Sequence, residues 1–416
     1  MISKFVHTAV AACIISASFN GIAQAKETIT FWGRSDQASL EVIVNEYNKA
    51  QDKVNVRLNI VPNSSLMSKL SSSIAAGNPP DLVALDIVYF PELNRSEQLV
   101  DLTDKVGKMD YISQFSDTLK AIGSYEGHIY GVPFAAESSF LYYNKKLFRQ
   151  AGLDPERPPE TLQELRDDAE KITKVGEGYY GFALPGGCSG CLAFTFVPYL
   201  WASGGDLVSA DGKTSVVDSA QNKKTLTFFH NKYKDGLISP LSRADSALND
   251  SFASGKIGMV GSGAFTFKVF RDNYPDIDYG VAYFPGEKKG DWASFSGGDA
   301  FAIPVGSKHE KEAIDFINWT LSKETQIEVL AKNGFIPTRQ DVSENPYSQK
   351  DAKYLLASKA LAKGHVPYLI PYNETINAQN SPLLTLIQKS VFEGDVDNAL
   401  KTADQKIKQI LKRSEQ

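Results

Sequence analysis

Two cysteines, Cys188 and Cys191, lie three positions apart in this 416-residue chain, a spacing found in redox-active, metal-binding and disulfide-bonded pairs. In a reducing compartment, a Cys-x-x-Cys pair is typical of redox work or of half a zinc site. The chain has no second cysteine or histidine pair at zinc-binding spacing. If the chain is exported to an oxidising compartment, the pair indicates a small disulfide, here within a glycine-rich loop. We therefore predict a Cys188–Cys191 disulfide without thioredoxin-type activity, because the motif is not expected at a strand-to-helix turn.

The remaining side chains form no recognisable catalytic or metal-binding set. The four histidines outside the N-terminal segment are isolated from one another: His128, His230, His309 and His365. The chain has no nucleophile elbow, phosphate-binding loop or dinucleotide glycine fingerprint. Its many carboxylates are not arranged so that two of them stand out as a glycosidase pair. We expect no metal, no cofactor and no enzymatic activity.

A second group of residues could bind a ligand without making or breaking a bond. The first predicted strand ends just before Gly33, and ligands bind outside the carboxyl ends of strands in open α/β sheets. Trp32 can offer a flat face to a sugar ring, or belong to the core. Arg34 can make a forked hydrogen bond to hydroxyls, a carboxylate or a sulfonate, or be structural. Ser35 and Asp36 can contact the ligand or cap the following helix.

A similar group precedes the next predicted helix, where Asn63 is followed by Ser64 and Ser65. The free N–H groups at the start of a helix, together with hydroxyls, can hold a polar or anionic group. The alternative is an ordinary helix cap.

An alternation of strands and helices positions these residues. Strand, helix, strand, helix and strand are predicted in turn at 28–32, 40–50, 54–60, 66–76 and 82–85. This order implies a parallel, doubly wound sheet. Beyond it, Gly131 and Pro133 punctuate a short strand, and further strands are predicted at 140–143, 257–260 and 279–283. Further helices are predicted at 145–150, 162–172, 221–233, 247–253, 265–274, 310–321 and 325–332, with two more within 383–412. At 162–172, Thr161 and Glu164 form a capping box.

The N-terminal segment has the features of a secretory signal peptide. Lys4 precedes an apolar stretch at 9–17, and Ala23-Gln24-Ala25 is a small-x-small cleavage site, so residues 1–25 are excluded from the fold. An alternative is lipidation at Cys13. No other window reaches the roughly 18 apolar residues of a membrane span. The net charge of −5 and the dispersed Lys and Arg residues argue against a nucleic-acid-binding surface.

Several short motifs occur in a particular order along the chain. They are Ala76-Gly77-Asn78-Pro79-Pro80-Asp81-Leu82, Tyr130-Gly131-Val132-Pro133, Phe140-Leu141-Tyr142-Tyr143-Asn144-Lys145-Lys146-Leu147-Phe148, Trp201-Ala202-Ser203-Gly204-Gly205, Phe252-Ala253-Ser254-Gly255-Lys256-Ile257-Gly258-Met259 and Asn333-Gly334-Phe335-Ile336-Pro337-Thr338. In this order the chain resembles the family 1 extracellular solute-binding proteins, the maltose-binding-protein-like receptors of bacterial ABC importers. The resemblance covers almost all of residues 26–416. The Cys-Ser-Gly-Cys insert departs from the family pattern and could shape a ligand wall of its own.

The resemblance implies a particular architecture. It is a two-lobe α/β periplasmic-binding-protein fold of type II, each lobe a doubly wound sheet flanked by helices, with the ligand cleft between the lobes. The first lobe would comprise 26–134 plus 293–340, and the second 135–292 plus 341–416. The lobes would close around the ligand by a hinge motion. The implied partners are a small solute and the membrane subunits of the importer, with the receptor a monomer in the periplasm.

The resemblance also adds candidate ligand-binding residues. Asp86 follows the third strand and Tyr89 lies one helical turn beyond it, while Glu137 and Ser138 lie at the crossover between the lobes. The others are Trp201 and Phe265 as an aromatic wall or as core, Gly297 and Gly298 as a close backbone approach or a plain turn, and Trp292, Asp299 and Arg339.

These features predict a receptor that captures a carbohydrate or a similar polar solute for an ABC importer. The first alternative is a receptor for an anionic solute, such as a glycerol phosphodiester or an acidic or sulfonated sugar. Arg34, the pair Ser64 and Ser65, and Arg339 motivate it. The second alternative is a secreted glycoside-active enzyme, for which Glu137 would be the obvious carboxylate.

Overall fold

The computed structural model describes residues 26–34, 37–245 and 248–414. The predicted signal peptide, Cys13, Ser35 and Asp36 lie outside these residues. No helix in the described ranges has both the length and the apolar character of a membrane span.

The first part of the chain forms the predicted alternation. Its elements are β1 (Glu27–Arg34), α1 (Ser39–Ala50), β2 (Val54–Val61), α2 (Asn63–Ala75) and β3 (Leu82–Asp86). Strand β1 lies between β2 and β3 and pairs with both in parallel, so the predicted parallel arrangement is confirmed. In β1, Ile29 and Phe31 are buried on one face, while Trp32 and Arg34 lie on the other. Short elements follow: α3 (Phe90–Arg95), α4 (Thr103–Val106), α5 (Asp117–Ile122), β4 (Ser124–Tyr125) and β5 (His128–Ile129).

The central strand β6 runs unbroken from Val132 to Asn144. The prediction of a break after Pro133 and a separate strand at 140–143 is therefore wrong. The first half of β6 pairs antiparallel with β12 (Ser296–Ala302), and its second half pairs antiparallel with β8 (Ile257–Gly263) and β9 (Tyr279–Ala282). Pro133 is accommodated in the first half, where β12 is the one named strand beside β6 in the described residues, a setting in which proline is tolerated.

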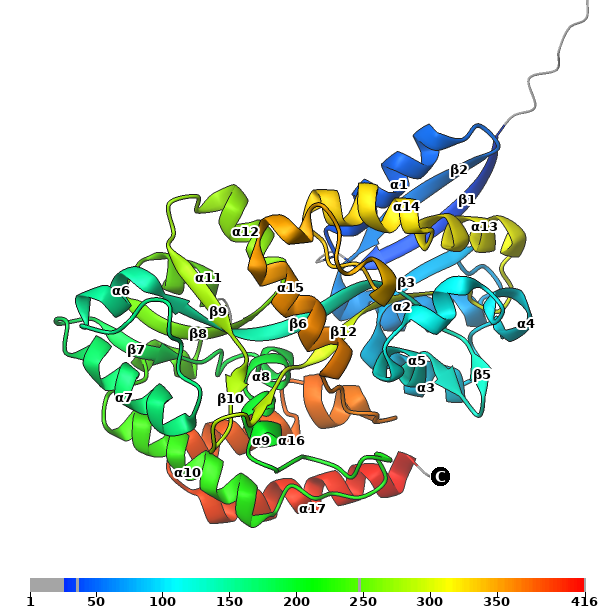
Figure 1. The fold of residues 1–416 in the computed structure, drawn as a ribbon. Coiled ribbons are helices and arrows are strands. Elements are labelled where there is room, and N and C mark those ends of the chain that lie inside the picture. The colour runs from blue at the N-terminus through cyan, green and yellow to red at the C-terminus, as the bar shows by residue number, and fades with distance from the viewer. Residues whose placement is uncertain (1–25, 35–36, 246–247, 415–416) are drawn as a thin grey trace, which may run out of the picture.

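The strand order makes one mixed sheet, β2-β1-β3-β12-β6-β8-β7, with β9 also on β6 and with β7 at Tyr180–Ala183. Strand β12 lies antiparallel between β3 and β6. Figure 1 shows β6 and β12 running between two groups of elements, one around β1–β3 and the other around β7–β9. The sheet therefore continues through both groups.

The second group contains most of the remaining helices. They are α6 (Lys145–Gln150), α7 (Leu162–Thr173), α8 (Ser189–Thr195), α9 (Val197–Ala202), α10 (Ala220–Lys234), α11 (Leu248–Ala253) and α12 (Phe265–Asn273). A small hairpin follows, β10 (Phe284–Pro285) with β11 (Trp292–Ala293). Thr161 caps α7 as predicted, accepting a hydrogen bond from the Glu164 amide at 3.1 Å. Glu164 does not complete the capping box, because its carboxylate accepts from the amide of Glu160 rather than that of Thr161.

The last part of the chain adds helices to both groups of elements. It contains α13 (Glu310–Thr320), α14 (Lys323–Thr325), α15 (Ala352–Lys363), α16 (Pro382–Ile387) and α17 (Val396–Ser414). The helix predicted at 325–332 is a continuous helical stretch that changes to a π-turn at Gln326–Leu330 and a 3₁₀ turn at Ala331–Asn333. The sequence did not predict α3, α4, α5, α8, α9 or α15.

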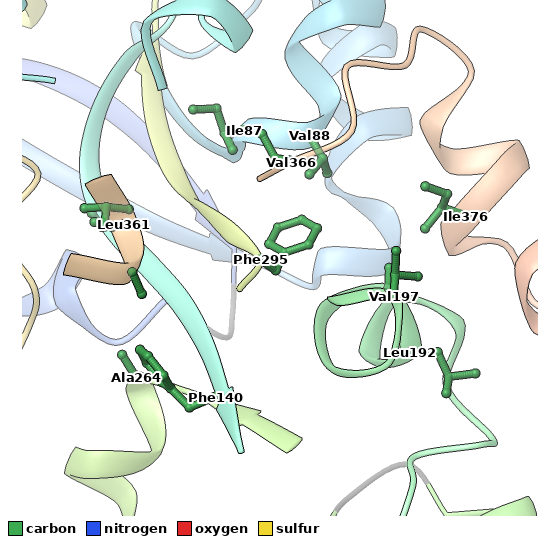
Figure 2. Packing of buried hydrophobic residues seen from close by; sticks show 14 of the residues in the cluster. Ile87, Val88, Phe140, Leu192, Val197, Ala264, Phe295, Leu361, Val366 and Ile376 are labelled. Atoms are coloured by element: carbon green, nitrogen blue, oxygen red, sulfur yellow. The ribbon is translucent and has the colours of Figure 1, made fainter. Parts of the chain in front are cut away.

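The apolar core continues across the junction of the two groups. Figure 2 shows the Phe295 ring between Ile87, Val88 and Val366 on one side and Val197 of α9 on the other. Because Phe295 directly precedes β12 and is 5% exposed, the start of β12 is fixed by packing from both groups.

Lys232 of α10 is an isolated amine in this core, completely buried. Its Nζ lies 4.1 Å from the centre of the Phe182 ring and has no hydrogen-bond partner among the described residues. Burial lowers the pKa of this amine well below its ordinary value of 10.5. A buried polar group without a hydrogen bond costs about 1–3 kcal/mol, and the contact with the aromatic face offsets a part of that cost.

Lys232→Met is expected to raise the free energy of unfolding at pH 7 by about 1–3 kcal/mol, because methionine fills similar space without the polar nitrogen. Urea denaturation would measure the change. Because the folded-state pKa is lowered, the original chain gains stability as the pH rises from that pKa towards 10.5, so the difference between the two proteins should narrow at alkaline pH. The matched control is Lys234→Met on the exposed side of the same helix, with little change expected. A less stable Lys232→Met protein would contradict the prediction.

Candidate functional site

The end of β1 is tied to β12 by a forked ion pair. Arg34 donates from Nε to Asp299 Oδ1 at 2.6 Å and from Nη2 to Oδ2 at 2.8 Å. Gln37 also donates to Asp299 Oδ2, and its own Oε1 accepts from the Ser39 hydroxyl at 2.9 Å. Asp299 is completely buried, and the Arg34 side chain is 13% exposed. The paired charges therefore cancel locally at the carboxyl end of β1.

Asp299 lies beside a bulge in β6, where Phe134 is the extra residue that has no partner on β12. The pairing register with β6 shifts between Asp299 and Ala300. The preceding Gly298 has a φ of +131°, and a Cβ there would lie 2.0 Å from the carbonyl oxygen of Ala135. Only glycine fits this backbone next to Asp299. The close neighbour of Gly298 is thus β6, and the approach of its backbone to a ligand stays a prediction.

Glu137 lies on β6, where it pairs with Gly297 of β12. Its carboxyl group contacts the first residue of α12. Its Oε2 accepts a hydrogen bond from the Phe265 amide at 3.2 Å. Burial raises the pKa of Glu137 to about 8, although part of the residue stays exposed. The Phe265 amide and the nearby Arg34 charge act in the opposite direction, and the Asp299 charge adds to the rise. Glu137 therefore carries a proton at neutral pH and can donate a hydrogen bond.

An aromatic row starts beside Glu137. The ring of Phe265 is 47% exposed and lies 6.4 Å, centre to centre, from the ring of Phe194 on α8. Phe194 lies 5.3 Å from Phe295, and Phe295 lies 6.1 Å from Trp201 on α9. Such a large exposed ring next to polar groups is a surface on which a sugar ring can stack.

The end of β3 meets a segment from late in the chain. Asp86 pairs in register with Asp299, and its carboxylate accepts from the Val88 amide at 3.2 Å. The Tyr89 hydroxyl accepts from Asn377 Nδ2 at 3.1 Å. Burial and, to a lesser degree, the charges of Asp86 and Tyr89 raise the pKa of Tyr372, which places its hydroxyl in the same neighbourhood.

Arg34, Asp86, Glu137, Phe265, Gly297, Gly298 and Asp299 are thus brought together. The other sequence candidates lie elsewhere or have structural partners. Trp32 is partly buried and packs against the core. The Ser65 hydroxyl donates to the Pro62 carbonyl at 3.2 Å, and that of buried Ser138 to the Ala357 carbonyl at 3.3 Å. Nothing is described for the side chain of Ser64.

Arg339 and Trp292 lie away from this cluster. Arg339 is 1% exposed, and all five of its N–H donors are used within the fold, by Asp110, Asp341 and the Leu321 carbonyl. Trp292 lies in the β10–β11 hairpin, where its ring stacks on Tyr283 at 3.9 Å. The ligand contacts predicted for these two residues stay predictions.

Trp201 lines a cavity of about 410 Å³ at the far end of the aromatic row. Its Nε1 donates to Asp206 at 2.9 Å, and its ring meets that of His365 edge-on at 4.6 Å.

The described residues contain no group of three or more His, Cys, Asp or Glu side chains that could hold a metal ion.

Cys188 and Cys191 form the predicted disulfide. The expectation that this motif does not lie at a strand-to-helix turn is wrong, however. The motif follows β7, and Cys188 is the N-cap of α8. The loop is also tied to the segment that reaches Tyr89. The buried hydroxyl of Ser189 donates to the Ile376 carbonyl, and Gly190 lies against the Asn377 side chain.

Opening this disulfide is expected to lower the free energy of unfolding by about 2 kcal/mol, the chain-entropy estimate for so short a loop. Melting temperatures measured with and without reductant would show the change. Cys188→Ser combined with Cys191→Ser should melt near the reduced protein and no longer respond to reductant. An unchanged melting temperature after verified reduction would contradict the prediction.

Several residues of this region were not found from the sequence. Gln37 lies three residues after Arg34, and its place in the turn beyond β1 was a usable signal. Phe194, Asp206, His365, Tyr372 and Asn377 lie in unpredicted helices or irregular segments, and no local pattern marks them.

Hydrogen-bonding groups beside an exposed aromatic ring, at the junction of a two-part α/β fold, define a protein that binds a solute. The chain belongs to the bacterial extracellular solute-binding protein family, whose sequence model matches residues 32–327. The predicted family and two-lobe fold class are therefore confirmed.

Individual relatives agree with this assignment. The chain is 25% identical to the diacetylchitobiose binding protein DasA of Streptomyces coelicolor over 381 residues, covering 87% of this chain and 85% of DasA. It is 26% identical to the sn-glycerol-3-phosphate-binding periplasmic protein UgpB of Escherichia coli, covering 99% of both. The crystal structure of the cyclic alpha-maltosyl-1,6-maltose binding protein from Arthrobacter globiformis superposes with a TM-score of 0.79 at 26% identity, covering 93% of this chain and 100% of that one. All three are named as binding proteins.

Proposed function

We propose that this chain is the substrate-binding protein of an ABC importer and that it captures a neutral carbohydrate. The ligand stacks on the exposed Phe265 ring and makes hydrogen bonds to Glu137 and to the polar groups around Asp86. The observation that carries the proposal is Phe265, a 47% exposed aromatic residue whose backbone amide donates to the Glu137 carboxyl group. Similarity to a chitobiose-derivative receptor and a cyclic maltosaccharide receptor supports this class of ligand.

A neutral ligand fits the charges of this region better than an anionic one. The fork of Arg34 is bound to Asp299, and Arg339 is fully bonded inside the fold. Both arginines that motivated an anionic ligand are therefore matched by carboxylates, Asp86 adds another carboxylate, and the protonated Glu137 supplies no positive charge. An anionic solute such as a glycerol phosphate remains the second candidate, because UgpB is as similar as the sugar receptors are.

The proposed mechanism is closure of two lobes around the ligand, the first made of 26–134 and 293–340 and the second of 135–292 and 341–416. Support comes from β6, whose two halves pair with different strands, and from Asn377, which reaches Tyr89 across the proposed boundary. A ligand shifts such an equilibrium only if it binds the closed form more tightly. We further propose that residues 1–25 direct export, and that the receptor acts in the periplasm as a monomer that delivers its ligand to the permease.

A thermal-shift screen tests this function. The processed chain is heated with neutral mono- and oligosaccharides, acidic and sulfonated sugars, polyols and glycerol phosphodiesters. A ligand that binds only the folded state adds about 2.7 kcal/mol of stability at a hundredfold excess over its Kd. We expect a shift with a neutral sugar and none with the anionic compounds.

Phe265→Ala is the matched variant for this screen, because the ring is exposed and its removal should leave the fold intact. Loss of the stacked ring should weaken sugar binding roughly tenfold. A shift with glycerol phosphodiesters alone would favour the second candidate. No shift with any compound, or equal binding by Phe265→Ala, would overturn the proposed site.

A further inference from the structure

A larger cavity, of about 560 Å³, is lined by other residues than those of the proposed ligand site. Its walls come from three segments of the chain: α12 with the residues up to Tyr279, the stretch 331–337 after the π-turn, and the stretch 345–358 that leads into α15. None of the ligand-binding residues predicted from the sequence lines it. A volume in this range is ordinary for a small-molecule site.

Aromatic side chains make up much of the wall. They come from all three segments: Phe270, Tyr274, Tyr279, Phe335, Tyr347 and Tyr354. The hydroxyls of Tyr279 and Tyr354 make no hydrogen bond to another described residue, so both can donate to a bound molecule. By contrast, Tyr274 donates to Asp250 and Tyr347 to Glu328. The cavity therefore offers ring faces together with two unused polar groups.

The charges around this cavity are mainly positive. Arg271, Lys332 and Lys350 line it, with Arg271 paired with Asp272 at 2.9 Å. The single acid in the lining, Asp351, is itself paired with Lys353 at 3.0 Å. Lys332 and Lys350 are exposed and have no ion-pair partner among the described residues. These two lysines can therefore attract an anionic group to the opening.

The absence of a side chain at Gly334 makes room for Arg271 at the cavity wall. Arg271 Nε donates to Asp272 at 2.9 Å, and a Cβ on Gly334 would lie 2.8 Å from Arg271 Nη1 and 3.0 Å from the Tyr354 hydroxyl. Gly334 has a φ of +83°, a conformation that favours glycine. The missing side chain leaves the guanidinium and the phenol together at the cavity wall.

We propose that this cavity is a second ligand site, which takes a planar aromatic ring carrying an anionic group. The ring lies among the aromatic side chains, and the anion faces Arg271, Lys332 and Lys350. Neither Phe265 nor Glu137 lines this cavity, although Phe265 begins the helix α12 that also contributes Phe267 and Phe270 to its wall.

The test uses 8-anilinonaphthalene-1-sulfonate as the probe, with the processed full-length chain. Its fluorescence should rise on addition of protein and saturate with one probe per chain, and calorimetry should give the same stoichiometry. The uncharged N-phenyl-1-naphthylamine should bind at least threefold more weakly. Raised salt should weaken binding of the sulfonate alone.

Two kinds of variant locate the probe. Ser358→Phe fills the cavity from α15 and should abolish saturable binding. Lys332→Gln combined with Lys350→Gln removes exposed charges without disturbing the core, and should weaken binding at least threefold. The matched control, Lys311→Gln combined with Lys408→Gln, changes two exposed lysines outside the cavity and should bind like the original protein.

The outcomes separate this site from the carbohydrate site. Phe265→Ala should bind the probe like the original protein; loss of probe binding in that variant would overturn the proposal. The proposal also fails if no saturable binding occurs, or if the double lysine variant binds with unchanged affinity. Circular dichroism confirms folding of each variant, and the double lysine variant remains decisive if Ser358→Phe does not fold.

Discussion

Asp299→Ala is expected to lower the free energy of unfolding by about 3–5 kcal/mol, the usual cost of removing one partner from a buried ion pair. The carboxylate accepts three hydrogen bonds, two from Arg34 and one from Gln37, and it is completely buried. Without it, the largely buried Arg34 guanidinium loses its charge partner at the carboxyl end of β1. Urea denaturation at pH 7 would measure the loss.

The matched control for Asp299→Ala is Asp117→Ala, which removes an exposed carboxylate paired with Lys120. Exposed pairs contribute little, so its melting temperature should stay close to that of the original protein. Asp299→Asn should fall between the two, because its amide keeps one acceptor for Arg34. If Asp299→Ala were as stable as Asp117→Ala, the forked pair would not hold β1 and β12 together.

The second large effect is a dependence of stability on pH that comes from Glu137. Its pKa is raised from 4.5 to about 8 in the folded protein, mainly by burial. Between these two pH values the folded chain keeps a proton that the unfolded chain has released. Stability should therefore fall as the pH rises through this window, by up to about 1.4 kcal/mol per pH unit from this group alone.

Glu137→Gln tests this effect, because glutamine resembles the protonated acid and does not titrate. The difference in unfolding free energy between the variant and the original protein should be small at pH 4.5 and should grow in favour of the variant up to pH 8. Denaturation curves at pH 4.5, 6 and 8 would measure it. Parallel pH profiles for the two proteins would show that Glu137 is ionised in the folded state.

The strands and helices of the first part were predictable because each carries its own signal. The apolar alternation of 54–60 marks β2, and the short apolar run at 82–85 marks β3. By contrast, Pro133 was interpreted as a break, although β6 continues through it. A proline is harmless in a strand half that has one neighbour, and a local pattern does not show how many neighbours a strand has.

The candidate site was predictable only in part. Strand ends pointed to Arg34, and the family resemblance pointed to Asp86, Glu137 and Asp299. The forked pair itself joins residues on β1 and β12, far apart in the chain, and Asp299 follows Gly298, whose backbone conformation only glycine fits. The helix α8 was missed because its glycine-rich start resembles a loop, and with it the place of Cys188 as a helix cap was missed.

The position of β12 delays completion of the sheet during synthesis of the chain. Strand β12 fills the place between β3 and β6, yet β3 ends at Asp86 and β12 begins at Ser296. During synthesis from the N-terminus, the nascent chain holds β3 long before the strand that covers its edge exists. Such late, long-range pairing is slow to form, and partly made chains expose an unpaired strand edge. The protein can therefore reach its native state only after most of its length has been synthesised.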